Sequence, residues 1–461
     1  MKPGSGHLSR TLSAVEYFTF GFGSMVGVGW VVLIDDWLGR GGPAGAMLGF
    51  LAGGALLLPV ALTYGKLVRA IPDAGAEIAY AEGVFPPSIA FAAAWTMVLA
   101  YAIVCPWEAV AIGNLSARVF PAMNSVPLYT VAGKTIFLPR LLAGLLLTAA
   151  IAWVNLRGIR PSSRFQNFAT FGLLAIFAAF AVAGFAKGDP SNWQPLFAKP
   201  GSAGAWLSIL LVLQIVPYFM TGFESIGKES EEARPGFDPR HFGRAILLAC
   251  AVGVFFYTTV VAVASYVFPW KDLVAGHLGT EAAFQRAFGS PLIARIIVFA
   301  AFLSLLKIFN GNFVASTRLL FGIGKRGLVH PSLARVDTAR GAPSLAIALM
   351  AALTAACAFL GDALLVPVTE VGSLAVGVGW LSACAAFVAR ARRGSLAASG
   401  GDLFLAIAGA AISLAIVAMK ALPSVPGSFT RAEWIAFAFW SALGFLFWLG
   451  RRPAETPFSS R

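Results

Sequence analysis

Apolar stretches long enough to cross a lipid bilayer recur along almost the whole chain, and they constrain the fold more than any other feature. A helix of about 20 residues spans the hydrocarbon core, and about twelve such stretches lie between Ala14 and Leu449. Of the 461 residues, 58% are hydrophobic and 12% are charged, which is far more apolar than a soluble globular protein. Because backbone polar groups in lipid need partners within their own segment, the spans are predicted to be helices.

We therefore predict an all-α polytopic membrane protein without a separate soluble domain. The approximate spans are residues 14–36, 44–68, 88–118, 137–156, 164–186, 205–226, 241–268, 291–315, 343–361, 366–389, 402–422 and 431–449.

Basic residues gather in alternate loops, and this pattern predicts the orientation in the membrane. A net charge of +13 would suggest a nucleic-acid partner in a soluble protein, but loops rich in Lys and Arg mark the cytoplasmic side of a membrane protein. We expect both termini in the cytoplasm, a plasma (inner) membrane location and no nucleic-acid partner. The basic positions are Arg10; Arg157, Arg160 and Arg164; Arg234, Arg240 and Arg244; Lys325, Arg326, Arg335 and Arg340; Arg390, Arg392 and Arg393; and Arg451 and Arg452.

Two glycine-bearing interruptions fall inside apolar spans. The run from Gly23 to Gly29 lies in the middle of the first span, and Thr221-Gly222-Phe223-Glu224 lies in the sixth. Irregular backbone at membrane depth is tolerated only where it is buried in protein or lines a cavity, so the two breaks predict a ligand site. Their spacing predicts two inverted five-helix repeats followed by two further helices. The alternative for Gly23 and Gly27 is a Gly-x-x-x-Gly helix-packing face.

Five motifs in the expected order resemble those of the amino acid-polyamine-organocation (APC) superfamily of permeases. They are the Gly23 to Gly29 run in the first helix, Gly42-Pro43-Ala44-Gly45 at the start of the second, Asn155-Leu156-Arg157-Gly158 before the fifth, Gly222-Phe223-Glu224 with Glu231-Glu232 and Pro235 in the sixth and its exit, and Ser316-Thr317-Arg318 with Gly327-Leu328 at the end of the eighth. The resemblance covers most of the chain. It implies the leucine-transporter fold and transport of an amino acid or related amine.

With this fold, residues 1–461 form a single membrane transport domain. The first repeat is expected over residues 14–186, the second over 205–389, and the two additional helices over 402–449.

Unwound backbone in the first span is expected to bind the substrate carboxylate. The amides of Gly27, Val28 and Gly29 lie at the positive end of the following half-helix, which favours an anion. Gly23, at the start of the same run, is a further candidate for substrate binding.

Carbonyl groups released by the two breaks are expected to accept hydrogen bonds from a substrate ammonium group. The candidates are Met25 in the first span and Phe219, Met220 and Thr221 in the sixth. Tyr218 resembles the aromatic residue that closes over substrate in relatives, and the alternative is a plain packing role.

Ionisable groups inside a span are costly to bury and indicate function. Cys105 and Glu108 lie three residues apart on one helical face, which in the family borders the substrate. Glu108 would favour cationic or amine-bearing substrates, or form a salt bridge to Lys307.

Glu224 belongs to the family motif, in which the carboxylate resembles a gating or proton-responsive group; the alternative is a carboxylate satisfied by backbone donors of the broken helix. Asn312 either adds specificity to the pocket or bonds between helices.

Lys307 is the candidate for ion coupling. Many proton-coupled members of the family carry a lysine in the fifth helix, where this chain has Gly172 and Leu173. In sodium-dependent relatives the first and eighth helices bind the ion, and the ammonium of Lys307 would take its place. We expect a sodium-independent transporter that is proton-coupled or exchanging; the alternative is a fixed structural partner of Glu108 or Glu224.

The leading function is secondary active transport of an amino acid or related amine by alternating access. The alternatives are an ethanolamine or polyamine transporter of the same fold, or an amino acid sensor without net transport.

An enzyme is not expected, because the histidines lie in loops or near the termini and no nucleophile stands beside a base. Rings of polar pore-lining residues, which a channel needs, are not evident. The cysteines lack metal-ligand spacing, so no metal or cofactor is predicted; the partners are the small-molecule substrate, membrane lipid and protons.

Overall fold

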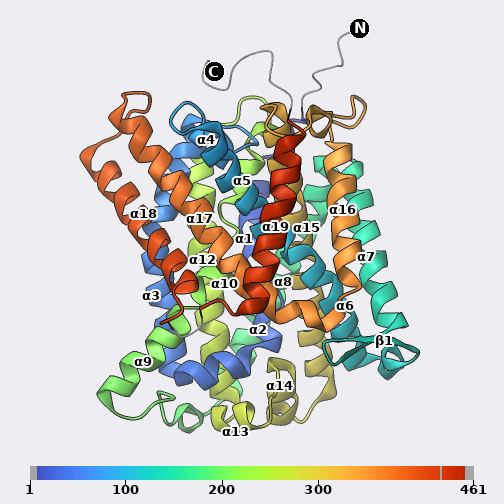
Figure 1. Ribbon diagram of the computed structural model, residues 1–461. Coiled ribbons are helices and arrows are strands. Elements are labelled where there is room, and N and C mark those ends of the chain that lie inside the picture. Colours follow the sequence, from blue (N-terminus) through green and yellow to red (C-terminus); the bar gives the residue numbers. More distant parts are fainter. Residues whose placement is uncertain (1–7, 426–427, 452–461) are drawn as a thin grey trace.

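The chain forms a bundle of helices that run roughly along one axis, with α4 (Glu77–Ala81) at one end and α13 (Trp270–Ala275) and α14 (Thr280–Phe288) at the other (Figure 1). The computed structural model describes residues 8–425 and 428–451, except for the side chains of residues 364–369. Within this part, ten helices are long and apolar enough to cross a membrane, a bent pair makes an eleventh span, and Ser344–Ala358 is a shorter apolar helix. The predicted all-α polytopic fold is confirmed.

The remaining helices have the following bounds: α1 (Ala14–Met25), α2 (Gly29–Val32), α3 (Ile34–Ala70), α5 (Pro87–Ala102), α6 (Val104–Val119), α7 (Leu138–Leu156), α8 (Ile159–Lys187), α9 (Gly201–Leu213), α10 (Val216–Met220), α11 (Ser225–Lys228), α12 (Arg240–Val267), α15 (Pro291–Lys325), α16 (Ser344–Ala358), α17 (Leu365–Arg392), α18 (Gly400–Ala421) and α19 (Arg431–Leu449). A short 3-10 helix, η3 (Ser230–Glu232), follows α11. The antiparallel strands β1 (Pro127–Val131) and β2 (Lys134–Phe137) form a hairpin between α6 and α7.

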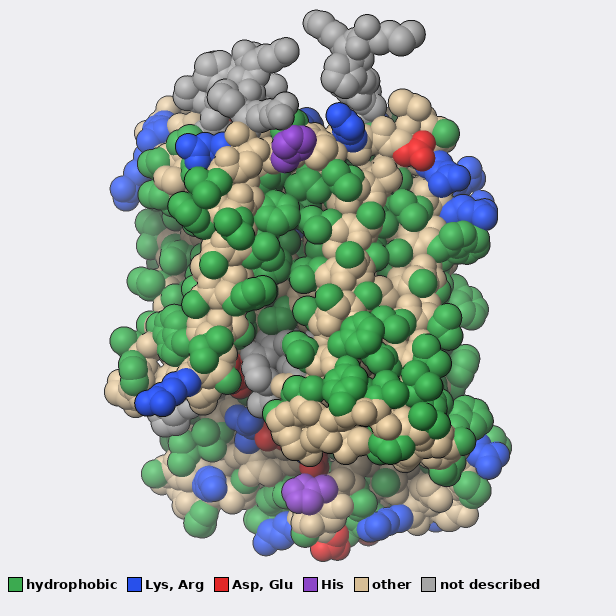
Figure 2. Space-filling model, turned by 45° about the vertical axis from the view of Figure 1, so that its right-hand side comes forward, with side chains coloured by type: hydrophobic (Ala, Val, Ile, Leu, Met, Phe, Trp, Pro, Cys, Tyr) green, Lys and Arg blue, Asp and Glu red, His purple; other side chains and the backbone are tan. Residues whose placement is uncertain are grey.

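Apolar side chains cover the face of the bundle between its two ends, and Lys and Arg side chains gather near the ends (Figure 2). This distribution fits a protein whose middle lies in lipid, where a charged side chain is expensive. Helix α19, of which only 17% is buried, is attached through two reciprocal hydrogen bonds: the indole of Trp95 donates to the carbonyl of Trp440, and the indole of Trp440 donates to the carbonyl of Trp95, each at 3.0 Å.

The first span is broken where the glycine run predicted it. A capping box between Ser13 and Glu16 starts α1, and the helix ends at Met25. Val26 is extended, with φ −97° and ψ 101°, and helical structure resumes at Gly29 in α2.

The boundary between the first two spans differs from the prediction, which ended the first at residue 36. Helical backbone continues into the start of α3 and turns at Gly42, whose φ is +65° and ψ is 177°. A side chain at Gly42 would meet the backbone of Ala198 at 2.7 Å. The sharp turn therefore requires glycine here, both for its conformation and for the close approach of another chain segment.

The sixth span is interrupted where it was predicted, because Thr221 to Glu224 form a turn between α10 and α11. The span has a further bend that was not predicted: α9 and α10–α11 meet at an angle of 41° between Leu213 and Val216. The two breaks touch, because a Cβ atom at Gly222 would lie 2.6 Å from the carbonyl carbon of Ser24 and 2.7 Å from the amide nitrogen of Met25. Helix α15, which is buried over most of its length, packs against α1 beside this contact. The inverted symmetry of the two repeats stays a prediction.

Candidate substrate site at the two helix breaks

A small cavity of about 30 Å³ lies where the two breaks meet. Most of the residues that the sequence predicted for substrate binding line it: Met25, Gly27, Val28, Gly29, Glu108, Tyr218, Phe219 and Thr221. The two breaks and α6 thus come together around one buried space.

Two predicted residues, Cys105 and Met220, are buried outside the lining of the cavity. The thiol of Cys105 lies 3.7 Å from the carbonyl oxygen of Tyr101, one turn back along its own segment. Residues three apart on a helix point about 60° away from one another, whereas residues four apart differ by about 40°. Val104, four residues before Glu108, therefore takes the place beside the carboxylate that was predicted for Cys105.

Gly23 and Asn312 lie behind the first break rather than in the cavity. A Cβ atom at Gly23 would collide with the side chain of Gln166 at 1.9 Å. The amide of Asn312 donates to the carbonyl of Ser24 at 3.1 Å and to that of Ile308 at 2.8 Å. Asn312 therefore bonds between helices, which was the alternative to a specificity role.

The carbonyl groups of the first break already have partners, so the groups that it leaves for a ligand are its N–H donors. The hydroxyl of Tyr257 donates to the carbonyl of Met25 at 3.1 Å. This oxygen is therefore not free for a substrate ammonium group, contrary to the prediction. In the part of the chain that the structure describes, the N–H groups of Val28 and Gly29 have no acceptor within hydrogen-bonding distance. Unpaired amides in a buried site favour a negatively charged ligand group.

The sixth break offers acceptors. Among the described residues, no donor reaches the carbonyls of Phe219, Met220 and Thr221. An unpaired buried carbonyl costs about 1–3 kcal/mol. The two breaks therefore bring unpaired donors and unpaired acceptors to one place, an arrangement complementary to a group that carries a carboxylate and an ammonium.

Glu108 borders the cavity with an incompletely satisfied carboxylate. The residue is 2% exposed, and its Oε2 has no hydrogen-bond partner among the described residues. No ion pair within 4 Å joins Glu108 to Lys307 in that part of the chain, so the alternative of a direct salt bridge is wrong for this conformation. The carboxylate is left to face the cavity beside Gly27, where a Cβ atom would lie 3.2 Å from Oε1.

Lys307 ties α15 to the first break. Its ammonium donates to the carbonyls of Gly23, at 3.3 Å, and of Val26. The hydroxyl of Ser304 adds contacts to the carbonyls of Val26, at 3.1 Å, and Gly27, at 2.7 Å. Because no ion pair joins Lys307 to Glu108 or Glu224 among the described residues, its partners are these backbone oxygens.

Glu224 holds the sixth break together from outside the cavity. Its carboxylate accepts hydrogen bonds from the hydroxyl of Thr221 at 2.7 Å, the amide of Gly222 at 3.0 Å and the hydroxyl of Tyr101 at 3.1 Å. This is the geometry of a carboxylate satisfied by donors of the broken helix, with one side-chain donor from α5 added.

Comparison with known proteins identifies the family. A family model described as amino acid permease matches residues 12–447. The chain belongs to this family. It is therefore a transporter and not an enzyme. The permease is 26% identical to the methylthioribose transporter of Bacillus subtilis (strain 168) over 454 residues, which cover 96% of this chain and 93% of the relative.

Two other relatives from the same organism are amino acid permeases. The amino-acid permease RocE is 24% identical over 385 residues, or 81% of this chain and 79% of the relative. The branched-chain amino acid permease BcaP is 25% identical over 391 residues, or 82% of this chain and 80% of the relative.

A larger cavity of about 560 Å³, here called the vestibule, adjoins the small cavity of the permease. Val28, Leu33, Trp107, Tyr218 and Phe219 line both. The vestibule lies toward the end of the bundle that carries α14, because Arg118 in its wall forms an ion pair with Glu281 of that helix. Tyr218 is thus one of the residues between the vestibule and the small cavity, and its closing over a substrate stays a prediction.

Trp107, Tyr257 and Ile308 line the small cavity of the permease and were missed by sequence reasoning. Trp107 precedes Glu108, and this adjacency was the one signal available in the sequence. Tyr257 and Ile308 lie in long apolar helices, where nothing distinguishes them from packing residues. Within the described ranges, no cluster of His, Cys, Asp and Glu could hold a metal ion.

Proposed function

We propose that this permease is a secondary active transporter that moves a small amino acid or related amine by alternating access. The observation that carries the proposal is the meeting of the unpaired amides of Val28 and Gly29 with the unpaired carbonyls of the sixth break at one buried cavity. A zwitterionic substrate would satisfy both sets, and binding at the interface of two broken helices suits a fold that opens alternately to either side. The predicted repeats, residues 14–186 and 205–389, belong to this proposal.

A second candidate is a same-fold transporter for an amine without a carboxylate, such as ethanolamine or a polyamine. The unpaired Oε2 of Glu108 favours this candidate, since a buried carboxylate pairs best with a cation. The names of the relatives span branched-chain amino acids and methylthioribose, so family membership alone leaves the substrate open.

Sodium independence is the third part of the proposal. The ammonium of Lys307 bonds the carbonyls of Gly23 and Val26, so α15 and the first break are joined without an ion from solution. In this role the ammonium of Lys307 replaces the fifth-helix lysine of proton-coupled relatives, and the permease is proton-coupled or exchanging.

The α4 end of the bundle is proposed to face the cytoplasm of a cell whose plasma membrane holds the permease. Leu12, ahead of α1, pairs with Ala233 in the basic loop after η3, and Arg10 donates to the carbonyl of Ala233 at 3.1 Å. Arg326 in another basic loop contacts Asp73 beside α4. Several Arg-rich loops thus share one end of the bundle, which favours a cytoplasmic assignment for that end.

The test starts with thermal-shift screening of the purified protein against amino acids and amines. Hits are then assayed for uptake into proteoliposomes at two pH values, with sodium or choline as the salt. We expect uptake that responds to the pH gradient and not to sodium, and a loss of at least about tenfold in Lys307→Ala, which leaves buried carbonyls unpaired. Lys66→Ala is the control, because Lys66 lies at the surface in an ion pair with Asp402.

Each alternative has a distinct result. Sodium-driven uptake by the wild type would overturn sodium independence, and tight binding without uptake would identify a sensor. A shift with amines and none with zwitterions would favour the second candidate.

A further inference from the structure

A buried ion pair lies on the α4 side of the sixth-span break, outside the substrate cavity. Lys228, the last residue of α11, pairs with Glu77, the first residue of α4, and both side chains are completely buried. The hydroxyl of Tyr64 donates to the same carboxylate at 2.8 Å, and the ammonium of Lys228 lies 4.9 Å from the centre of the Tyr101 ring. The pair thus joins the second half of the broken helix to α4.

Burial makes this pair sensitive to a change of structure. Removing one partner of a buried ion pair leaves an uncompensated charge, which is strongly destabilising, whereas removing both is often close to neutral. Separating the partners without water would leave both charges uncompensated, which is also strongly destabilising. The two charges therefore favour the arrangement in which α11 lies against α4, unless water enters between them.

Contacts run without interruption from the substrate cavity to the pair. Thr221, in the lining of the cavity, donates to the carboxylate of Glu224. The backbone carbonyl of Glu224 in turn accepts from Lys228 at 3.2 Å. A rearrangement of the break around a substrate would therefore displace the ammonium that Glu77 holds.

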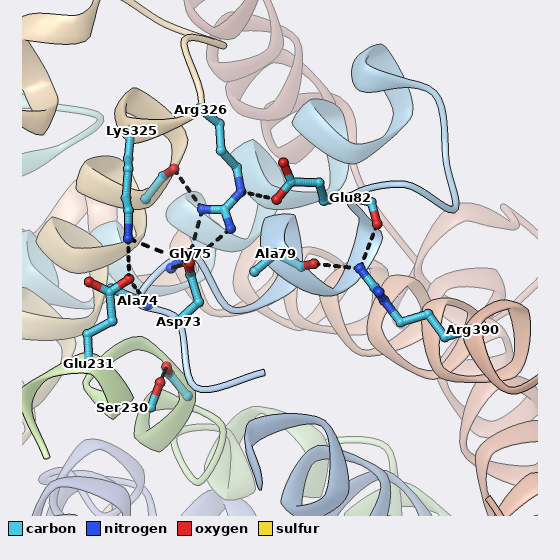
Figure 3. Close-up of polar contacts among 12 residues, drawn as sticks. Asp73, Ala74, Gly75, Ala79, Glu82, Ser230, Glu231, Lys325, Arg326 and Arg390 are labelled. Carbon is cyan, nitrogen blue, oxygen red and sulfur yellow. Dashed lines mark hydrogen bonds and ion pairs between the residues drawn. The ribbon is translucent and has the colours of Figure 1, made fainter. Parts of the chain in front are cut away.

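The α4 segment is fixed from its other side, as Figure 3 shows. Arg326, just after α15, pairs with Asp73 at 3.0 Å and with Glu82 at 2.9 Å. Arg390 of α17 donates to the carbonyl of Ala79 at 3.0 Å and to that of Glu82 at 2.6 Å. These contacts hold α4 to α15 and α17, so the movement proposed below is assigned to α11.

We propose that Lys228 and Glu77 are positioning residues for transport, which hold α11 against α4 while the cavity faces the vestibule and separate when the cavity opens at the α4 end. The inference rests on the proposed function, because it assigns the pair a role in alternating access. Water that enters on opening would hydrate both charges, so the pair sets the balance between the two states.

Thiol labelling tests the proposal without a known substrate. A cysteine at Ile226, a buried residue of α11, reports opening at the α4 end, and a cysteine at Ala111 reports access through the vestibule. Both are placed in a protein whose four native cysteines are replaced by alanine. We expect Glu77→Gln and Lys228→Met each to raise the labelling rate at Ile226→Cys about tenfold and to lower that at Ala111→Cys.

The double variant Glu77→Gln with Lys228→Met should return both rates most of the way to the parent values. The matched control is the exposed pair between Lys66 and Asp402, whose neutralisation in Lys66→Met and Asp402→Asn should change neither rate. If the single variants do not fold, Tyr64→Phe, which removes one hydrogen bond to Glu77, should shift both rates less but in the same directions.

Three results would overturn the proposal: unchanged labelling in the single variants, no recovery in the double variant, or a rise at both reporter sites. The last result would indicate loosened structure rather than a shift between two states. Failure to find a transported substrate would leave the labelling result intact, so the two proposals fail separately.

Discussion

At the scale of single residues, position 222 requires glycine for two reasons. Its φ of +125° lies in a region that other residues rarely adopt, and its Cα faces the backbone of Ser24 and Met25. Backbone strain alone costs about 1–3 kcal/mol, and displacement of a buried backbone segment adds to this cost.

We therefore predict that Gly222→Ala lowers the thermal unfolding midpoint and abolishes uptake. The control is Gly236→Ala, because Gly236 also has a positive φ, of 76°, but no atom lies within 4 Å of its added Cβ. This control should show only the smaller effect of strain in a thermal unfolding scan. Equal losses in both variants would mean that contact between the two breaks does not matter.

Glu108 is the residue whose charge is expected to select the substrate. Replacement by the isosteric glutamine in Glu108→Gln keeps the shape of the cavity and removes the negative charge, so affinity for amine-bearing hits should fall about tenfold. The measurement is the ligand-induced thermal shift over a concentration series. Glu433→Gln, a buried carboxylate at the start of α19, is the control, and an equal fall there would contradict the assignment.

At the scale of elements, the α11–η3 segment brings a buried carboxylate to the α4 end of the bundle. Burial, and the neighbouring Glu232, raise the pKa of Glu229 well above its ordinary value of 4.5, although Arg318 and Lys228 lower it in part. Neither carboxylate oxygen has a hydrogen-bond partner among the described residues. The charged and titratable groups around it are Tyr17, Tyr101, Lys228, Glu232 and Arg318.

This raised pKa predicts how closure at the α4 end depends on pH. The closed state, which buries Glu229, binds its proton more tightly than a hydrated open state. The protonation of Glu229 therefore stabilises the closed state fully below the ordinary carboxyl pKa of 4.5. This stabilisation is lost as pH rises through the higher pKa that Glu229 has in the closed state. Because the thiolate is the reactive form, the labelling rate of Ile226→Cys is divided by that of Ala111→Cys at each pH. This ratio should rise with pH over the window, and Glu229→Gln should flatten it; an unchanged ratio would contradict the prediction.

The helix breaks could be predicted from the sequence because two glycine-bearing interruptions fall in apolar spans at the spacing of a repeat, which favours broken helices over a helix-packing face. The exact end of the first span could not, because the turn at Gly42 depends on the approach of Ala198 from a distant segment. The same limit applies to the site. Sequence reasoning put Glu108 beside the predicted site, and Glu108 lines the cavity; the resemblance put Lys307 between the first and eighth helices. The individual carbonyls that Lys307 contacts, and the pair of Lys228 with Glu77 at a separation of 151 residues, could not be predicted, since both depend on tertiary packing.

At the scale of the whole molecule, the vestibule lies toward the α14 end of the bundle, whereas the pair of Lys228 and Glu77 toward the α4 end is completely buried. Ala111 lines the vestibule, whereas Ala169 is fully buried in α8. If the α4 end is cytoplasmic, a membrane-impermeant thiol reagent added outside cells should label Ala111→Cys and not Ala169→Cys. Labelling of Ala111→Cys only in inverted vesicles would reverse the proposed orientation.

The ammonium that joins α15 to the first break is part of the polypeptide. An ion drawn from solution stabilises its site only in proportion to its concentration relative to its dissociation constant. A tethered ammonium is present at a fixed effective concentration, so the contacts of Lys307 with Gly23 and Val26 do not weaken when the salt around the cell is diluted. In the sodium-independent mechanism proposed above, the joint between α15 and the first break would therefore hold equally well in fresh water and in brine.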